Sequence, residues 1–260
     1  MKKRKTALVT GATSGIGREL SELFAGDGYN LILVARNQVG LEDTAEQLRK
    51  NFNVPVMTVA QDLSLPTSPE AIFKLLQENS MHVDILVNNA GFNEYGPFWE
   101  TDLSQEIRMI QLNITSLTHL TKLLLPGMLE RKDGKILNVG STGSFAPGPY
   151  NAVYCATKAY ILSFSEAIGE ELEGSGVTVT TLCPGVTKTD FARRANMEKV
   201  KIFQGQLMEA KKVAQIGYHA LFKGRKTVIA GCANIVTILS LRFAPRTMVA
   251  KLAKSLMSMS

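Results

Sequence analysis

Short apolar runs alternate with longer segments of helical spacing along most of the chain. The runs are rich in Val, Ile and Leu, and they occupy residues 6–10, 31–35, 54–60, 83–88, 134–140, 177–183 and 226–231. Uninterrupted apolar runs of this length are typical of strands that are buried on both faces of a sheet. The pattern therefore predicts seven strands.

The segments between these runs have the length and spacing of helices. We expect helices over residues 16–26, 41–51, 69–79, 102–130, 150–173 and 208–222. A helix between two strands brings the strands into parallel pairing. The sequence thus predicts a single doubly wound α/β fold, in which helices flank a parallel sheet of about seven strands.

Two regions fall outside this alternation. Residues 184–207 have no clear period, and a stretch of that length in a compact domain is more often a functional lid than a passive connection. After Gly231 the apolar positions return at helical spacing and are interrupted at Pro245. We predict a main domain over residues 1–231. Residues 232–260 should form a C-terminal extension of two short amphipathic helices, the second starting near Pro245.

The composition is that of an ordinary globular domain. Of the 260 residues, 45% are hydrophobic and 20% charged, so the chain can bury a core without disulfides. The net charge of +6 comes from the two ends, where the basic residues are Lys2, Lys3, Arg4, Lys5, Arg242, Arg246, Lys251 and Lys254. Because the body between them is slightly acidic, we expect no nucleic-acid partner.

The cysteines and histidines match no disulfide framework and no metal site. They are few and scattered: Cys155, Cys183, Cys232, His82, His119 and His219. The basic start is followed by an apolar run that ends at Gly11, too short for a signal peptide. The uncharged apolar stretch near the C-terminus, residues 227–241, is also shorter than the ~20 residues that span a bilayer. We expect an unprocessed cytoplasmic protein without a metal or a membrane-spanning helix.

A glycine-rich turn, TGATSGIG at residues 10–17, joins the first predicted strand to the first helix. Glycines permit a tight turn and a close approach of the backbone to a diphosphate, whose charge the free N–H groups of the helix then meet. Such a turn can also be a loop that only needs positive φ angles, but its position favours a nucleotide site. The candidate contacts are Gly11, Thr13, Ser14, Gly15, Ile16 and Gly17.

Further motifs follow in a fixed order. They are Asn88-Asn89-Ala90-Gly91, Asn113, Ser141, Tyr154 with Lys158, and Pro184-Gly185. Together with the glycine-rich turn, their order and distances resemble the short-chain dehydrogenase/reductase family over about residues 5–231. The resemblance implies a Rossmann fold with a nicotinamide cofactor across the carboxyl ends of the strands. It also implies that the cofactor is bordered by Asp62, Leu63, Asn88, Ala90, Gly91, Pro184, Gly185, Val186 and Thr189.

The end of the second strand indicates which nicotinamide cofactor binds. An acidic residue there would hold a ribose 2′-hydroxyl, but the chain has Arg36 and no acid before Glu42. A guanidinium group suits a phosphate. We therefore predict NADP(H), with Arg36 on the 2′-phosphate and Ser14 as a second candidate contact. The alternative is an ordinary surface arginine at a strand end.

Tyr154 and Lys158 carry the predicted chemistry. They are four residues apart on a predicted helix and share one face, and no other of the six tyrosines has a lysine at that position. The resemblance implies that Tyr154 is the general acid for ketone reduction and that Lys158 lowers its pKa and holds the nicotinamide ribose. Ser141 would orient the substrate oxygen, with Ser144 as the competing serine. Asn113 would support a water that leads from Lys158 to solvent, or act as a capping or core amide.

The loops above the strand ends are aromatic, which favours an apolar substrate. They cover residues 92–99 and 145–150 and the lid with Phe191 and Phe203. We predict an NADPH-dependent reductase of a hydrophobic ketone, either a 3-oxoacyl thioester or a steroid-like or aliphatic carbonyl. The alternative is a non-catalytic NADP(H)-sensing or scaffolding protein. A sugar epimerase is disfavoured because too few residues follow the seventh strand for a further substrate domain.

The resemblance implies a homodimer or homotetramer that forms through the long helices at 102–130 and 150–173. The amphipathic tail has three candidate roles. It could dock on a partner subunit, close the substrate pocket, or lie weakly on an anionic membrane with its basic residues toward the headgroups. The sequence favours packing on protein.

Overall fold

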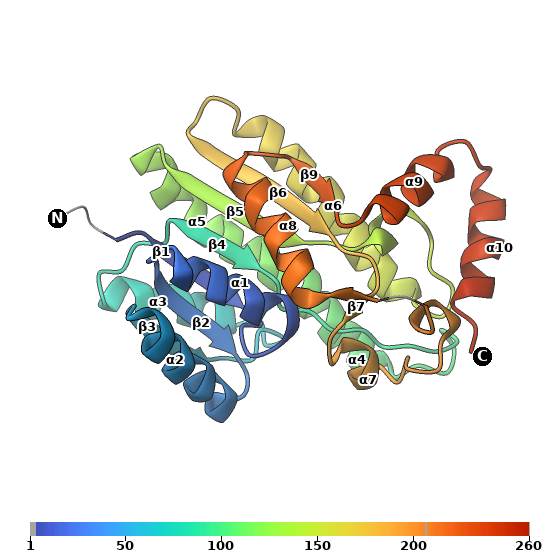
Figure 1. Ribbon diagram of the computed structural model, residues 1–260, viewed down its shortest axis with the longest axis horizontal. Coiled ribbons are helices and arrows are strands. Elements are labelled where there is room, and N and C mark those ends of the chain that lie inside the picture. Colours follow the sequence, from blue (N-terminus) through green and yellow to red (C-terminus); the bar gives the residue numbers. More distant parts are fainter. Residues whose placement is uncertain (1–3, 206, 260) are drawn as a thin grey trace.

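A parallel sheet runs through the middle of the molecule, as the computed structural model in Figure 1 shows for residues 4–205 and 207–259. Within these residues the order of its seven strands is β3-β2-β1-β4-β5-β6-β9. The strands are β1 (Thr6–Thr10), β2 (Asn30–Ala35), β3 (Val56–Ala60), β4 (Ile85–Asn88), β5 (Gly134–Val139), β6 (Val177–Cys183) and β9 (Thr227–Ile229). All seven predicted strands and their parallel pairing are confirmed.

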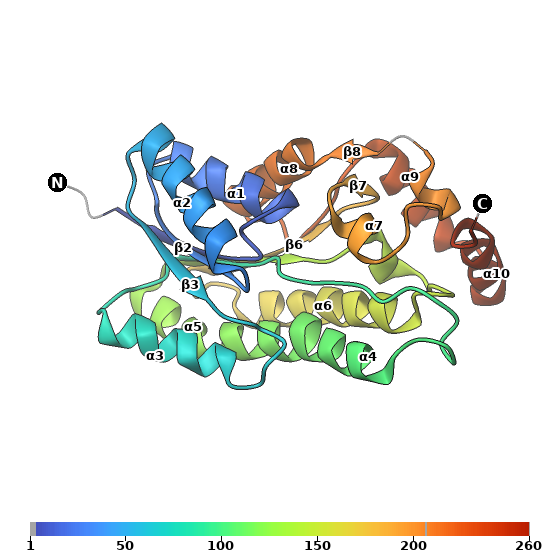
Figure 2. The same ribbon diagram turned by 90° about the horizontal axis from the view of Figure 1, so that it is seen from below.

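Helices cover both faces of this sheet (Figure 2). One face carries α1 (Gly15–Gly26), α2 (Gln38–Phe52) and α8 (Ala210–Phe222). The other carries α3 (Ser68–Glu78), α4 (Leu103–Ile110), α5 (Leu117–Arg131) and α6 (Ala152–Glu171). Successive residues of a strand point to opposite faces, so Ala7 and Val9 of β1 enter one core and Leu8 enters the other. The sheet is therefore buried on both sides, as its apolar runs predict.

The helix expected over residues 102–130 is not continuous. Residues Gln111–Ser116 form a π-helical turn, η1, between α4 and α5. In this turn the Asn113 side chain is bonded to the backbone of Phe92 and to Thr157, both on other segments. A π turn places one extra residue in the helix and often marks a functional site. The spacing of apolar residues along this segment does not indicate the interruption.

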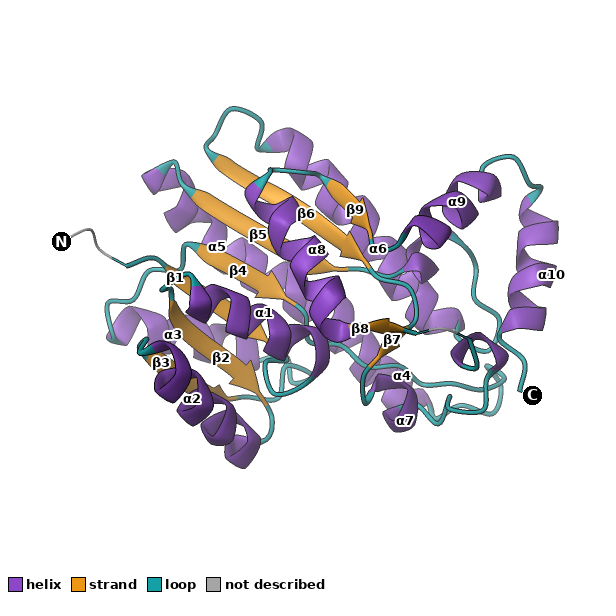
Figure 3. Cartoon of the chain, in the orientation of Figure 1, coloured by secondary structure: helices purple, strands orange, loops and turns teal. Residues whose placement is uncertain are grey.

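The segment after β6 contains short elements that the sequence pattern does not predict. They are β7 (Thr187–Lys188), α7 (Phe191–Arg194), the 3₁₀ turn η3 (Lys201–Phe203) and β8 (Met208–Glu209). β7 and β8 pair as a small ribbon apart from the main sheet (Figure 3). Because Met208 belongs to this ribbon, the helix predicted from residue 208 begins only at Ala210. Gln206 lies outside the described residues.

Two helices end the chain, as predicted. α9 spans Cys232–Leu241 and α10 spans Arg246–Leu256, directly after Pro245. Figure 1 shows both helices at the end of the molecule toward which the sheet strands point, with α10 farther from the sheet than α9. The tail therefore lies at the same end as the loops that follow the strands.

Candidate active site

The glycine-rich turn after β1 is shaped to receive a phosphate. Gly11 and Gly15 have φ angles of 66° and 54°, in the left-handed region that favours glycine. A Cβ on Gly17 would lie 2.4 Å from both the Gly11 carbonyl oxygen and Asn89 Nδ2. The Ser14 side chain makes no capping hydrogen bond, and the first turn of α1 has no acid. The first N–H groups of α1 are thus left for an anion, which fits a dinucleotide diphosphate.

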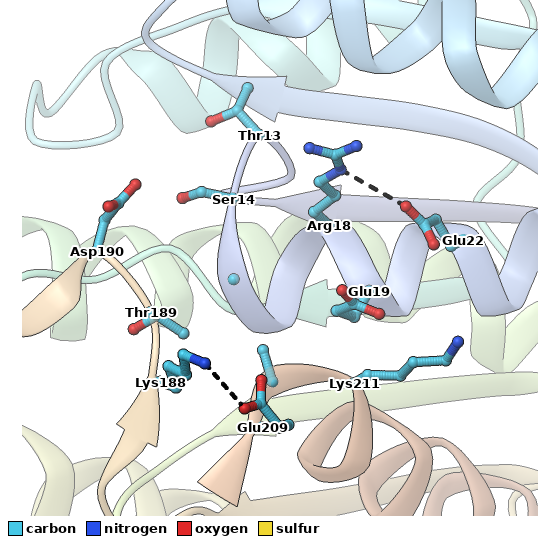
Figure 4. Close-up of a pocket in the computed structure, with 12 residues that line it drawn as sticks. Thr13, Ser14, Arg18, Glu19, Glu22, Lys188, Thr189, Asp190, Glu209 and Lys211 are labelled. Atoms are coloured by element: carbon cyan, nitrogen blue, oxygen red, sulfur yellow. Dashed lines mark hydrogen bonds and ion pairs between the residues drawn. The ribbon is translucent and has the colours of Figure 1, made fainter. Parts of the chain in front are cut away.

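A polar cavity of about 620 Å³ opens at this turn. Figure 4 shows Thr13 and Ser14 on one side, with Thr189 and Asp190 of the segment after β6 facing them. A Cβ on Gly15 would lie only 2.9 Å from the Thr189 side chain. The structure thus brings the predicted contacts Thr13, Ser14, Gly15 and Thr189 together. Ile16, in the first turn of α1, packs against the core.

Thr10 and Asn89 hold the turn in place. Neither residue is among the predicted contacts. Thr10 Oγ1 accepts hydrogen bonds from the backbone N–H groups of Asn89 and Ala90, each at 3.0 Å. Asn89 Nδ2 donates to the carbonyl oxygens of Thr10 and Gly11, at 2.9 and 3.2 Å. Both residues lie within the motifs at residues 10–17 and 88–91, so the sequence already pointed to them.

The Asn88 side chain faces the core, so the prediction that Asn88 flanks the cofactor stays a prediction for its backbone. Asn88 Nδ2 donates to Asn138 Oδ1 at 2.9 Å and to Thr121 Oγ1 at 3.2 Å, and the side chain is buried. A buried amide needs such partners, and these two hold β4 to β5 and α5. Ala90 and Gly91, which follow, are partly exposed at the site.

The adenine side of the predicted site gathers positive charge around Asp62. Burial would raise the pKa of Asp62, but hydrogen bonds from Ser64 and the guanidinium groups of Arg36 and Arg108 together hold it below its usual range. Arg108 Nη2 lies 3.2 Å from Asp62 Oδ2. The Arg36 side chain is exposed and makes no ion pair among the described residues, which leaves it available. Leu63 is buried beside Asp62.

Tyr154 and Lys158 lie on one face of α6, as predicted. Lys158 Nζ is 5.7 Å from the centre of the Tyr154 ring and donates to the Val139 carbonyl oxygen at 2.8 Å. Lys158 is 5% exposed, and burial lowers its pKa to about 8. Burial raises the pKa of Tyr154, and the hydrogen bond to Ser141 offsets this only in part. Burial thus dominates the pKa of Tyr154 in this structure, and the lowering of that pKa by Lys158 stays a prediction.

The structure separates the two competing serines. Ser144 Oγ donates to the Lys158 carbonyl oxygen at 2.8 Å and accepts from the Ser141 N–H at 3.2 Å, so it holds the backbone. Ser141 Oγ accepts from the Gly143 N–H at 3.0 Å and is hydrogen-bonded to the Tyr154 side chain. Ser141 is therefore the serine that meets the tyrosine.

Asn113, in the π-helical turn, lies near Lys158 of α6. Asn113 Nδ2 donates to the Phe92 carbonyl oxygen and to Thr157 Oγ1, at 3.2 and 3.1 Å. A Cβ on Gly91 would lie 3.0 Å from Asn113 Oδ1 and 3.6 Å from Lys158 Nζ. Asn113 is 1% exposed. Asn113 and Lys158 thus both lie next to Gly91. The water that would lead from Lys158 to solvent past Asn113 stays a prediction.

The segment after β6 closes over Tyr154. The rings of Phe191 and Tyr154 pack with their centres 5.6 Å apart. The Pro184 carbonyl oxygen accepts from the Thr142 N–H at 2.8 Å, and the Val186 carbonyl oxygen accepts from the Met208 N–H at 3.2 Å. A Cβ on Gly185 would collide with the Asn234 side chain of α9. Phe191 thus places this segment over the tyrosine, and its function as a lid stays a prediction.

Among the described residues, no three His, Cys, Asp or Glu side chains cluster as metal ligands. None of the helices within them is long and apolar enough to cross a membrane. Cys155 and Cys183 are buried free thiols and Cys232 is exposed.

The chain belongs to the short-chain dehydrogenase/reductase family. Residues 5–200 match the family model for short chain dehydrogenases. An uncharacterized oxidoreductase from Staphylococcus epidermidis is 34% identical over 206 residues, which cover 77% of this chain and 88% of that protein. The family resemblance drawn from the motifs is confirmed, and the protein is an oxidoreductase of this family.

Two similar proteins have named activities. The very-long-chain 3-oxoacyl-CoA reductase of Rattus norvegicus is 36% identical over 191 residues, which cover 72% of this chain and 61% of that protein. The 3-oxoacyl-acyl-carrier-protein reductase of Vibrio cholerae is 34% identical over 195 residues, which cover 75% of this chain and 78% of that protein.

Solved structures share the whole architecture. A short-chain dehydrogenase from Sphingobium yanoikuyae, in complex with NADPH, has a TM-score of 0.84 and 32% identity over 94% of both chains. The bulky-bulky ketone specific alcohol dehydrogenase from Comamonas testosteroni has a TM-score of 0.79 and 28% identity over 92% of both chains. The predicted Rossmann-like fold is confirmed.

The low pKa of Lys158 makes stability depend on pH. Between pH 8 and 10 the unfolded chain keeps this lysine protonated and the folded chain does not, so the lysine's contribution to stability rises with pH. We expect the free energy of unfolding of the wild type to gain roughly 2 kcal/mol relative to Lys158→Met between these pH values. Urea unfolding of the wild type and of Lys158→Met at pH 8 and at pH 10 measures this difference.

Comparing the two proteins removes the opposing effect of Cys155, whose thiol pKa burial raises to about 11. Burial raises the pKa of Cys183 to about 12, but this thiol interacts with Lys158, so both proteins carry Cys183→Ala. A stability difference that does not change with pH would contradict the burial of an uncharged Lys158.

Proposed function

We propose that the protein is an NADPH-dependent reductase that converts a hydrophobic ketone to the alcohol. The observation that carries this proposal is the meeting of Ser141, Tyr154 and Lys158 beside the phosphate-binding turn, at the carboxyl ends of the strands. Reduction of a ketone needs a proton donor and a hydrogen-bond donor on the same oxygen. Tyr154 and Ser141 are the two groups of this site that supply them.

Each side chain has a role in this mechanism. NADPH, when bound, supplies the hydride. Ser141 Oγ donates a hydrogen bond to the substrate oxygen, and the Tyr154 hydroxyl transfers its proton to that oxygen as negative charge develops. Lys158 holds the nicotinamide ribose hydroxyls. Asn113 orients a water that returns the proton from solvent through Lys158.

Tyr154 is protonated at neutral pH. Burial raises the pKa of Tyr154, so the phenol is in the form that the acid role in reduction requires.

The preference for NADPH rests on Arg36. It directly follows β2, where an acid would select NADH, and no acid follows before Glu42. The similar Sphingobium enzyme, solved with NADPH, supports the same choice.

The lid supports an apolar substrate. Ala195, Met197 and Val200 form a buried cluster of their own, against which Tyr95 and Phe203 pack. The Rattus and Vibrio relatives reduce 3-oxoacyl groups and the Comamonas enzyme is named for bulky ketones. We propose a 3-oxoacyl thioester, a steroid-like ketone or an aliphatic ketone as the substrate.

A homodimer or homotetramer completes the proposal. α4 exposes Leu103 and Ile107, and the neighbouring α6 exposes Tyr160, which is hydrogen-bonded to Thr118 of α5. Apolar side chains on a continuous helical surface mark an interface between subunits.

Replacing Arg36 tests the cofactor. For Arg36→Asp we expect the dissociation constant of NADPH to rise about ten- to a hundredfold, since a charge-assisted phosphate contact is lost. The dissociation constant of NADH should change far less. Fluorescence titration measures both, with Arg49→Asp on α2 as the control. Equal changes for the two cofactors would contradict the 2′-phosphate contact.

Replacing Tyr154 tests the chemistry. For Tyr154→Phe we expect kcat to fall by about 10²–10⁴ with NADPH binding retained, because the proton donor is removed. Tyr160→Phe on the same helix is the control. NADPH oxidation is measured over 3-oxoacyl thioesters, steroid ketones, aliphatic ketones and quinones. Full turnover by Tyr154→Phe would refute the mechanism. Tight NADPH binding without any turnover by the wild type would favour the sensing alternative.

Replacing Ile107 tests the assembly. For Ile107→Arg we expect light scattering to report a smaller particle, because a charge in an apolar interface is left unpaired. Val39→Arg, on α2 at the opposite face of the sheet, is the matched control and should leave the mass unchanged. An unchanged mass for Ile107→Arg would place the subunit contact elsewhere.

A further inference from the structure

The two C-terminal helices carry apolar side chains that the rest of the described chain leaves uncovered. On α9 and just after it these are Val236, Leu239 and Phe243, and Phe243 is 89% exposed. The other face of α9 is anchored on the protein through Ile238, which is buried. The helix thus has one packed face and one open apolar face.

α10 repeats this arrangement. Met248, Leu252 and Leu256 follow one another at steps of four residues and form a stripe, with Met248 61% and Leu252 58% exposed. Val249, on the adjoining side, is buried against the protein. Single exposed apolar residues are common on protein surfaces, but two neighbouring helices with apolar stripes form an interaction surface.

The charge of the tail is of one sign. No Asp or Glu occurs after Glu209, while the tail helices carry Arg242, Arg246, Lys251 and Lys254. All four side chains are exposed, and within the described residues none of them forms an ion pair. An apolar stripe beside unpaired basic residues is the pattern of a helix that lies in the interface of an anionic bilayer.

We propose that α9 and α10 dock the protein on an anionic lipid bilayer. The apolar stripes enter the boundary between headgroups and acyl chains, and the four basic residues meet the lipid phosphates. The docking is peripheral, since neither helix is long enough to cross the bilayer. It does not depend on the identity of the substrate.

The charges favour lipid over a symmetric contact between the tails of two copies. In a symmetric contact between two tails, the same four cations of each copy would face one another with no acid between them. Like charges brought together in an interface cost several kcal/mol. An anionic surface neutralises the same charges, so charge complementarity points to the bilayer.

The docking surface is joined directly to the lid. The Tyr95 hydroxyl donates to the Met257 carbonyl oxygen at 2.5 Å, and the Lys201 N–H donates to the Ser258 carbonyl oxygen at 3.2 Å. Asn151 Nδ2, next to the start of α6, lies 3.2 Å from Met257 Sδ. Docking through the tail therefore brings the lid of the candidate site close to the lipid.

Flotation of the full-length protein with vesicles tests the proposal. We expect it to float with vesicles of phosphatidylcholine that contain about 30% phosphatidylglycerol, and to remain at the bottom with pure phosphatidylcholine. Raising the salt to about 0.5 M should release it, because screening shortens the reach of the basic residues. Absence of flotation with the anionic vesicles would overturn the proposal.

Two double variants locate the surface. For Lys251→Gln with Lys254→Gln we expect the partition coefficient to fall about thirtyfold, since each base near an anionic surface contributes about fivefold. For Phe243→Ser with Leu252→Gln we expect a fall of at least about tenfold. The matched control, Lys50→Gln with Lys212→Gln, removes two exposed lysines outside the tail and should leave partitioning nearly unchanged.

Particle mass and circular dichroism accompany each flotation. A fall in partitioning of a folded tail variant with unchanged mass supports the proposal. Partitioning of both tail variants equal to that of the wild type would refute it. A smaller particle with unchanged partitioning would instead assign the apolar stripes to a subunit contact and refute lipid docking.

Discussion

The hydrogen bonds that join Thr10 to Asn89 and Ala90 are the contact on which the rest of the candidate site depends. They connect the ends of β1 and β4. In a parallel sheet all the strands end at one edge, and at the switch point between β1 and β4 the connections after the strands leave toward opposite faces and open a crevice. Asn89 Nδ2 also donates to the Gly11 carbonyl oxygen. The same side chain thus holds both the strand ends and the turn that would hold a diphosphate. The glycines then exclude any side chain from the space that the backbone must occupy.

Burial controls the acid–base character of the site. Tyr154 and Lys158 are largely removed from water, which favours the uncharged form of each group. A neutral phenol and a lysine that titrates near neutrality are suited to hand a proton to an oxygen and to recover it. The positions of these groups depend on a second layer of contacts. Ser144 holds the backbone of α6 at Lys158, and the π-helical turn presents Asn113 to Gly91.

The lid and the tail form one continuous structure above this site. Phe191 covers the tyrosine, Asn234 of α9 lies over Gly185, and the chain end is bonded to Tyr95 and Lys201. The tail therefore contacts the lid directly. The apolar lid cluster and the apolar stripes of the tail are both consistent with an enzyme whose substrate is poorly soluble in water.

The sequence alone determined the strands, their parallel pairing and the motif residues, because each of these depends on local composition or on short spacings. Buried strands require apolar runs, and a helix places Tyr154 and Lys158 on one face whatever surrounds it. Only the tertiary structure decided which of two serines meets the tyrosine, that Asn88 belongs to the core, and that a helix is interrupted at Asn113. It alone decided which apolar residues of the tail stay uncovered. Each of these outcomes depends on contacts between segments that are far apart along the chain, and the spacing of residues in a sequence does not record which segments meet.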